Sequence, residues 1–375
     1  MAGDFQLQLY LGKVAVLPAP ALLTDALQSA KVISSARDRT GFQLTFAVSR
    51  NSPITTTLLP AGLLDPETRI ILVALVRGLP QVLVDGVITT QSMNPGTEPG
   101  TATLTITGED LLVLLDLVKE RDNHLFLPPE LRVAKILAKE KYFKYGILPG
   151  AVAAVIPEIP DIAGQGAVQT DTDLKYLERL AGEVGYTFYL IPNRLPGTSI
   201  AYWGPEIRIG VPQPALTVDS GTATNVESLS FTMNGLARTR WTMDITIPFT
   251  KLTRSVSVPD LSLLRPPLAL RPAPQLKEAP LPSTANKSFA EVSLLGLAAT
   301  AKEADAVTAE GSLDVLRYGH ILRSRELVGV RGAGLAYDGL YYVTSVTHDL
   351  QRGQYKQTFS LSRDGLVSLT QQVPT

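Results

Sequence analysis

The sequence predicts a mainly β protein in which two similar β units flank a small α+β module. Three observations lead to this fold class. Residues 73–108 and 327–362 repeat one order of strands and turns, helical periodicity is confined to 109–184 and 289–306, and a proline-rich segment lies before the last helix. Because repeated segments usually mean that one structural unit is used twice, we expect an internal duplication.

The two copies keep an almost constant offset along the chain. Each predicts a strand, a tight glycine turn, a second strand, a loop and a third strand. The matching points are Val-Arg-Gly at 76–78 and 330–332 (offset 254), Asp-Gly at 85–86 and 338–339 (offset 253), and Leu104 with Phe359 (offset 255). Asp-Gly turns and threonine-rich strands are common in antiparallel meanders, so chance is the alternative. The constant spacing favours duplication, with both Asp-Gly pairs interpreted as hairpin turns.

Composition excludes several classes of protein. The chain has 375 residues, 45% of them hydrophobic and 18% charged, which indicates a globular protein of about two or three domains. A net charge of −1 offers no basic surface for nucleic acid or an anionic membrane. The absence of cysteine excludes disulfides and thiolate chemistry.

The chain shows no targeting signal. We see no signal peptide at its start, and its longest apolar runs, such as 70–76, are shorter than the ~20 residues that span a bilayer. We therefore expect synthesis in the cytoplasm without a membrane anchor. The low charge also suggests that partners cover part of the surface.

The first β unit is predicted over 5–108. Phe42, Leu44, Phe46 and Val48 alternate with more polar residues, as in a strand with one buried face. The periodicity changes at Gly108, and we expect a helix over 111–119, with acidic residues at its start, and another over 128–145, opened by two prolines.

The clearest helix is predicted over 172–184. Thr172 is a suitable N-cap, Leu174, Leu177 and Leu180 form an apolar stripe, and Gly185 is a C-terminal stop. A strand over 186–191 follows at once, so the middle of the chain is expected to combine helices with strands. We expect the apolar stripe to pack on this strand's sheet.

Strands return over 225–249, and the next segment is rich in proline. Seven prolines between 259 and 282 argue against a position inside a sheet or helix. A flexible linker is one interpretation, but the leucines favour an extended arm lying in a groove of this chain or of a neighbouring subunit. These leucines are Leu261, Leu263, Leu264, Leu268 and Leu270.

A helix over 289–306 leads into the second β unit. There Tyr355, Gln357, Phe359 and Leu361 share one face, after a hairpin turn at 349–353. The expected organisation is therefore a first β unit with a trailing helix (1–125), an α+β module (126–210), returning strands (211–257), a proline-rich arm (258–288), and a helix with the second β unit (289–375).

No catalytic, cofactor-binding or metal-binding residue is predicted. His124, His320 and His348 lack the spacing of metal ligands, so we interpret them as structural or surface residues. Asp-Ser-Gly at 219–221 resembles an aspartic protease turn, but that chemistry needs a second carboxylate from another copy. Gly-Ala-Gly at 332–334 is not a nucleotide loop, because Tyr337 occupies the third glycine position. A pair of glycosidase-type carboxylates far apart in sequence stays open.

Four segments together resemble a known family. They are Thr-Asp-Leu-Lys-Tyr-Leu-Glu-Arg-Leu-Ala-Gly-Glu-Val-Gly-Tyr-Thr-Phe-Tyr at 172–189, Ala-Thr-Asn-Val-Glu-Ser-Leu-Ser-Phe at 223–231, Asp-Gly-Leu-Tyr-Tyr-Val-Thr-Ser-Val-Thr-His at 338–348, and Val-Ile-Thr at 87–89 with 103–110. Taken together, these segments resemble the baseplate hub proteins of contractile phage tails and contractile injection systems. This is the late control gene D family, which also forms the first part of VgrG-type spikes.

The resemblance implies two tail-tube-like β-barrels in one chain and a homotrimer whose six barrels match a hexameric inner tube. The implied partners are a separate spike with an OB-fold and β-helix, an inner tube or tube-initiator protein, and other baseplate subunits. The implied function is structural, in a phage tail or injection particle, with no enzymatic activity and no cofactor. The alternatives are a tail-associated cell-wall hydrolase and a carbohydrate-binding β protein.

Overall fold

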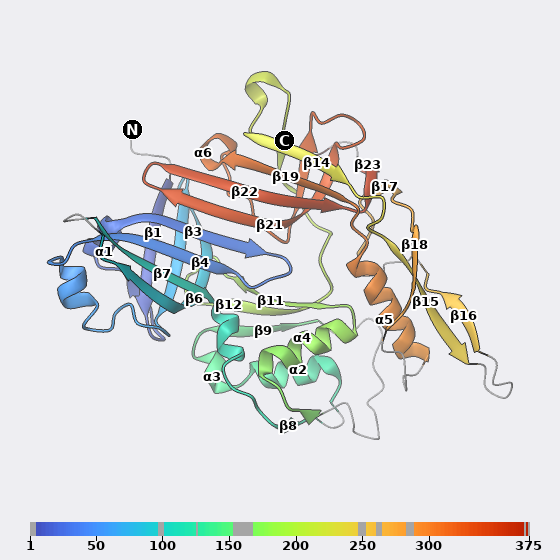
Figure 1. Cartoon of the computed structure of the whole chain (residues 1–375), viewed down its shortest axis with the longest axis horizontal. Helices are drawn as coiled ribbons and strands as arrows, with labels where there is room; N and C mark the ends of the chain where they lie inside the picture. Colours follow the sequence, from blue (N-terminus) through green and yellow to red (C-terminus); the bar gives the residue numbers. More distant parts are fainter. Residues whose placement is uncertain are drawn as a thin grey trace.

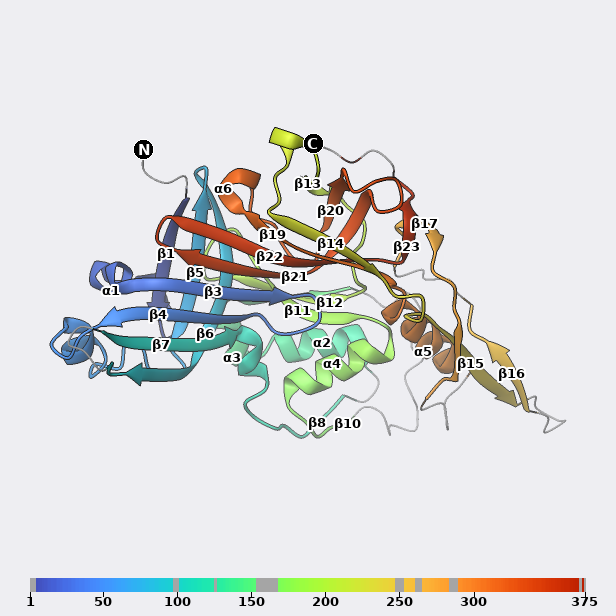
Figure 2. The same cartoon turned by 45° about the horizontal axis from the view of Figure 1, so that its top comes forward.

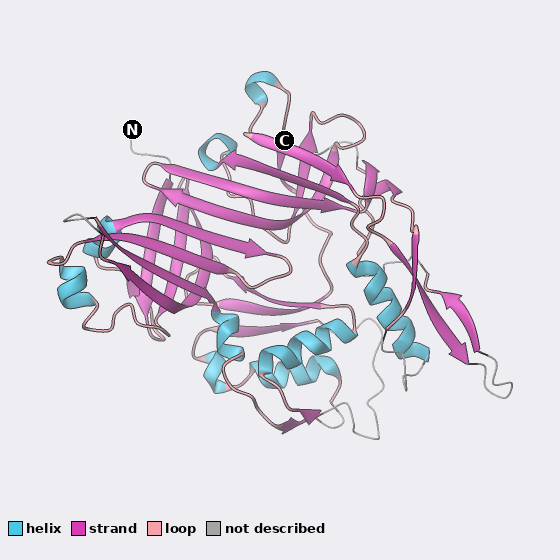
Figure 3. Ribbon diagram, viewed as in Figure 1, coloured by secondary structure: helices cyan, strands magenta, loops and turns pink. Residues whose placement is uncertain are grey.

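The protein is built mainly from antiparallel strands, as the sequence predicts (Figure 3). The architecture comes from a computed structural model that describes residues 5–96, 101–124, 127–152, 168–246, 253–259, 265–282, 289–370 and 373. One sheet of thirteen strands contains most of the β structure and draws strands from both ends of the sequence. None of the helices in the described ranges has the length and apolar character needed to cross a membrane.

The first β unit contains the N-terminal strands of this sheet, in the order β3-β4-β7-β6-β5-β1-β2. In β4 and β7 alternate residues are buried, which confirms the predicted period of two. The elements are β1 (Phe5–Gly12), β2 (Leu17–Pro18), α1 (Ala21–Ala26), β3 (Leu27–Ser35), β4 (Gly41–Val48), helical turn η1 (Ile54–Leu58), β5 (Arg69–Val76), β6 (Leu79–Asn94), β7 (Ala102–Asp110) and helical turn η2 (Leu111–Leu115).

The second β unit continues the sheet in the order β14-β19-β22-β21, with β20 and β13 branching from β21. Tyr355, Gln357, Phe359 and Leu361 on β22 are all buried, as expected from their shared face. The elements are β13 (Gln213–Thr217), η3 (Gly221–Ala223), β14 (Ser228–Met233), β19 (Val307–Asp314), α6 (Val315–Tyr318), β20 (Leu327–Arg331), β21 (Gly339–Gln351), β22 (Gln354–Arg363) and β23 (Gly365–Ser368).

The two β units are joined by antiparallel pairing of β3 with β21, from Ser35 opposite Ser345 to Ser29 opposite Gln351. Figures 1 and 2 show β22, β21, β3 and β4 following one another across this junction. The largest hydrophobic cluster contains buried residues of both units, for example Phe46 and Leu361. The units therefore share one core.

Both units contain a meander of three strands with the same irregularity. In β6 the register against β7 shifts at Thr89, and in β21 the register against β22 shifts at Thr344. The Thr89 hydroxyl donates to the Thr107 carbonyl at 3.3 Å, and the Thr344 hydroxyl donates to the Ser360 carbonyl at 2.9 Å. A bulge at corresponding positions is independent support for the duplication inferred from sequence.

Of the two Asp-Gly pairs, only the second lies in a hairpin connection, between β20 and β21, as predicted. Asp85 lies inside β6 and its carboxylate receives two hydrogen bonds from Arg69 on β5, both at 2.7 Å, so this pair is not a hairpin turn. The turn of that hairpin is formed instead by Arg77 and Gly78, both with positive φ. Asp338 closes the loop before β21 by accepting a hydrogen bond from the Ala333 amide.

The middle of the chain forms an α+β module. Helices pack against a three-stranded sheet of order β11-β12-β9, and the apolar stripe of α4 is buried in their common core, as predicted. Its elements are β8 (Asp122–Asn123), α2 (Pro129–Leu137), α3 (Glu140–Phe143), β9 (Ile147–Ala151), β10 (Val168–Gln169), α4 (Asp173–Glu183), β11 (Thr187–Pro192) and β12 (Ser199–Gly204).

The helix boundaries confirm some predictions and correct others. The Thr172 hydroxyl caps α4 by accepting from the Lys175 amide, and Gly185 follows with φ of +72°. The helix expected over 111–119 is only the turn η2, because the chain then becomes extended and Lys119 pairs with Thr172. The helix expected over 128–145 is divided at Lys139, whose extended backbone ends α2 and starts α3.

The proline-rich arm contains two short strands, which corrects the expectation that it lies outside sheets. β17 (Ala269–Pro272) pairs with β23, and β18 (Lys277–Pro280) pairs in parallel with β15 (Thr239–Thr246), beside β16 (Thr253–Ser257). Both strands end in proline, and β18 is an edge strand, where a missing amide donor is tolerated. Helix α5 (Phe289–Lys302) packs beside β15.

The described part of the arm is attached to its own chain. Leu268 is buried whereas Leu270 is exposed, and Leu261, Leu263 and Leu264 lie outside the described residues, as do 247–249 of the expected strand. Arg265 and Arg208 both pair with Asp305, at 2.9 and 2.6 Å, so one carboxylate connects the arm to the start of the second unit. Contacts within the chain therefore hold the described part of the arm.

Candidate functional site

The residues that attracted attention in the sequence occupy structural positions. His124 is buried and its Nε2 lies 3.1 Å from the Gln169 amide oxygen, His348 is buried with Nδ1 2.7 Å from the Tyr355 hydroxyl, and His320 is exposed. Within the described ranges, no group of three or more histidine, aspartate or glutamate side chains is arranged to hold a metal ion. Asp219 lies in an exposed turn, and 332–334 form part of the loop before β21.

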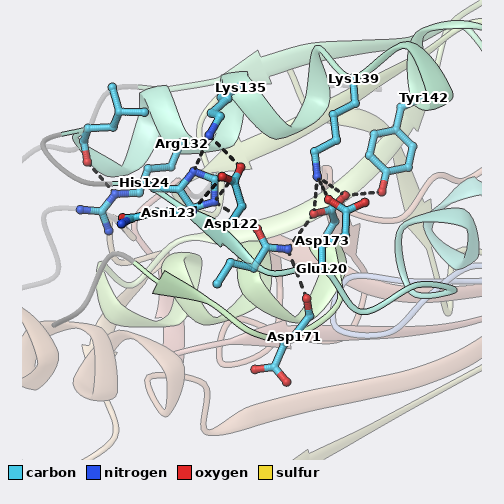
Figure 4. A network of polar contacts seen from close by, with 12 residues as sticks. Glu120, Asp122, Asn123, His124, Arg132, Lys135, Lys139, Tyr142, Asp171 and Asp173 are labelled. Atoms are coloured by element: carbon cyan, nitrogen blue, oxygen red, sulfur yellow. Dashed lines mark hydrogen bonds and ion pairs between the residues drawn. The ribbon is translucent and has the colours of Figure 1, made fainter. Parts of the chain in front are cut away.

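A network of charged side chains lies at the centre of the module (Figure 4). Asp173 is fully buried at the start of α4, where its carboxylate accepts from Lys139 at 2.8 Å, Tyr142 at 2.5 Å and Gln169 at 2.7 Å. Burial alone would raise the pKa of Asp173, but these hydrogen bonds outweigh it and hold that pKa below its ordinary value. Glu120 also bonds Lys139.

This network joins elements that lie apart in sequence, and its charges are matched. Two lysines, Lys139 and Lys141, face two carboxylates, Glu120 and Asp173. Every oxygen of the buried carboxylate has a donor, so no position is left for a substrate or ion. The network therefore stabilises the packing of α2, α3 and α4 against one another.

The strongest candidate site is a cavity of about 570 Å³ between the two β units and the module. Most of its lining comes from three separate parts of the chain: 80–85 of β6, 189–194 at the end of β11, and 323–327 before and within β20. Further lining residues are Ser34, Thr40, Asp110, Ser199, Ile207, 209–211 and His348. The contacts between β6 and β11 close one side of the cavity. Its lining is mixed, with apolar side chains, two aspartates and several arginines.

The two aspartates in the cavity are already engaged. Asp85 is bound by Arg69, and burial raises its pKa although the arginine opposes the shift. Asp110 accepts hydrogen bonds from the amides of Thr40, at 3.0 Å, and Leu112, at 3.1 Å. Burial raises the pKa of Asp110 to about 6. Each oxygen of Asp110 therefore accepts one backbone hydrogen bond, and Asp85 is held by the arginine.

Arg325 is a buried cation of the cavity: no carboxylate among the described residues lies within ion-pair distance of its guanidinium, although the charge of Asp110 acts on it from farther away. It stacks on the Tyr189 ring at 4.1 Å from the centroid, and its buried Nε has no hydrogen-bond acceptor. Burial lowers the pKa of this guanidinium. Its backbone has φ of +64°, a conformation that an arginine rarely adopts.

Sequence analysis did not find this cavity. Its lining comes from many separate segments that no motif connects, and the isolated residue Arg325 carries no local signal. The only hint was the low overall charge, which predicts surface covered by partners.

Comparison with known proteins identifies the fold. No family model matches the sequence, and no curated protein matches it either. Among solved structures, a tail protein from Neisseria meningitidis MC58 has a TM-score of 0.64 at 16% identity, covering 97% of this chain and 98% of that one. The 43 kDa tail protein of prophage MuSo2 from Shewanella oneidensis has a TM-score of 0.59 at 14% identity, covering 96% and 99%.

A third structure connects the fold with secretion systems. It is the Escherichia coli protein c3393, described as a component of the type VI secretion system with structural similarity to the bacteriophage T4 tail proteins gp27 and gp5. Its TM-score is 0.54 at 12% identity, covering 93% of this chain and 75% of that one. The chain therefore has the fold of phage tail proteins and of related secretion-system components, as its resemblance implied.

Proposed function

We propose that the chain is a structural hub of a contractile tail or injection system. Its two β units, the first within 1–125 and the second within 289–375 together with the returning strands β13 and β14, would act as tube-like barrels, and three copies would present six such units to a hexameric inner tube. The threefold end would receive a spike. The fold shared with tail proteins supports this role, and the doubled meander with its matched bulges at Thr89 and Thr344 carries it.

The rest of the molecule is consistent with a structural role. The acids of the main cavity and of the module network are bound by arginine, lysine or backbone amides, so they are held for packing. We propose that the protein is made in the cytoplasm and incorporated into a tail or injection particle, where it contacts the spike, the tube and other baseplate subunits.

Light scattering coupled to size-exclusion chromatography tests the assembly. We expect a mass of three chains, and we expect the trimer to bind the spike and tube proteins encoded beside its gene. A peptidoglycan-release assay on the same sample tests the hydrolase alternative. A stable monomer that degrades cell walls would overturn the proposal.

A further inference from the structure

Two strand edges that face the main cavity have no partner in the described structure. Residues 79–85 of β6 pair with β5 on one side, but pairing with β7 on the other side begins only at Gly86. β11 pairs with β12 alone. Both edges line the cavity, and unpaired strand edges are templates for an added strand.

We propose that this cavity is a docking slot for an extended acidic segment of a partner protein, which adds a strand along β6 and places one carboxylate on Arg325. Pro80 has no amide hydrogen, so the pairing capacity of β6 lies in 81–85, enough for a strand of about five residues. The proposal concerns a single copy of the chain and does not depend on threefold assembly.

The charge of the cavity selects an acidic occupant. The Arg325 guanidinium has lost part of its hydration, yet no carboxylate among the described residues pairs with it, and a desolvated cation is stabilised by an ionic partner. Arg323, its neighbour, is already paired with Glu326 at 2.9 Å. A buried guanidinium that lies near Asp85 and Asp110, and that the charge of Asp110 already acts on, suits a singly charged carboxylate better than a phosphate dianion.

The mouth of the cavity selects an occupant that is otherwise apolar. Ile207, Ile209 and Val211 are 48%, 74% and 91% exposed at its rim, and Ile191 at the edge of β11 is also exposed. An extended segment with an acid between apolar residues would cover these side chains and present its carboxylate inward. A partner polypeptide satisfies the free backbone edge, the cation and the apolar rim together, which a small anion does not.

A heptapeptide display library screened against the full-length chain tests the proposal. We expect enriched sequences to share one aspartate or glutamate flanked by apolar residues. Synthetic peptides of the enriched sequence should bind Arg325→Gln at least tenfold more weakly than wild type, and replacing their acid by the amide should cause a similar loss. Arg50→Gln, at an exposed arginine outside the lining of the cavity, is the matched control and should bind normally.

Hydrogen exchange separates strand addition from simple ion pairing. The bound peptide should protect amides in 81–85 and in 187–192 of the wild-type chain. Arg325→Lys keeps the charge and should retain part of the affinity for the peptide. If the glutamine variant does not fold, the affinity of the lysine variant tests the proposal in its place. The proposal is overturned by a library without enrichment, by enriched peptides without an acid, or by equal binding to Arg325→Gln. It is also overturned if 81–85 become protected by rising protein concentration alone, because the occupant is then a second copy.

Discussion

Both meanders end at a buried aspartate, but the two aspartates bind different segments of the chain. A buried aspartate marks the end of the third strand in each unit, Asp110 as the last residue of β7 and Asp364 directly after β22, and each carboxylate accepts hydrogen bonds from two backbone amides. Asp110 binds Thr40, before β4 of its own sheet, and Leu112 in the turn η2. Asp364 binds Leu268 and Ala269, which belong to the proline-rich arm.

The difference shows how one inherited device can serve two purposes. In the first unit the carboxylate of Asp110 lies where β7 ends, and it binds the turn η2 that leads towards the module. In the second unit the carboxylate of Asp364 holds a segment that enters from about a hundred residues earlier. Two backbone amides supply donors in both cases, from distant residues bound to both oxygens of Asp110 and from neighbouring residues bound to one oxygen of Asp364.

The largest effect should come from a feature that only the first unit has. Arg69 and Asp85 form a buried ion pair across β5 and β6, whereas Asp338, which corresponds to Asp85 by the offset of the duplication, accepts a hydrogen bond from the Ala333 amide in the loop before β21. Asp85→Ala leaves a buried, unpaired guanidinium and should lower the free energy of unfolding by about 3–5 kcal/mol. Urea denaturation measures this loss. The double change Arg69→Met with Asp85→Leu should recover most of it, and failure to recover would contradict the assignment.

The second-largest effect should be a pH dependence of the free energy of unfolding that comes from Asp110. Its pKa of about 6 in the folded chain lies above the ordinary 3.8, so the folded state binds the proton more tightly. Stability from this group is complete below pH 3.8 and is lost as pH rises through 6, by up to about 3 kcal/mol. The difference in unfolding free energy between wild type and Asp110→Asn, followed from pH 4 to 7, isolates the effect. A constant difference would refute it.

The arm depends on the matching residue of the second unit. Asp364→Ala removes the acceptor of two buried amides and should cost about 1–3 kcal/mol. Hydrogen exchange should show faster exchange at 268–269 than in wild type, whereas the amides at 40 and 112, held by Asp110, should be unaffected. Asp364→Asn keeps one acceptor oxygen and serves as the control, with an intermediate loss expected.

The smallest effect should come from the bulges that make the meanders alike. Thr89→Val and Thr344→Val each remove one hydrogen bond to the neighbouring strand without changing side-chain shape. Each should cost about 0.5–1.5 kcal/mol, with the larger loss at the shorter bond of Thr344. Thermal melting of the two variants side by side measures them. A loss at one site and none at the other would argue that the bulges are not equivalent.

Sequence reasoning succeeded where signals are local. The cap, stripe and stop of α4 lie within fourteen residues, so Thr172 and Gly185 predict its ends closely. It failed where a distant residue decides the conformation. Asp85 resembles a turn residue until Arg69 on the adjacent strand is seen to bind it, and 116–119 leave the helical conformation because Thr172 pairs with them. The cavity could not be predicted because many separate segments form it.

The pairing of β3 with β21 also determines when the protein can fold. β3 emerges early from the ribosome, but its partner is among the last strands to be made, so the edge of β3 next to the junction has no native partner during most of synthesis. Pairings between such distant segments form slowly, and an uncovered edge exposes the chain to wrong associations meanwhile. Co-translational folding of the first unit therefore remains incomplete until residues 345–351 arrive, and a chain that stops before them keeps an open sheet.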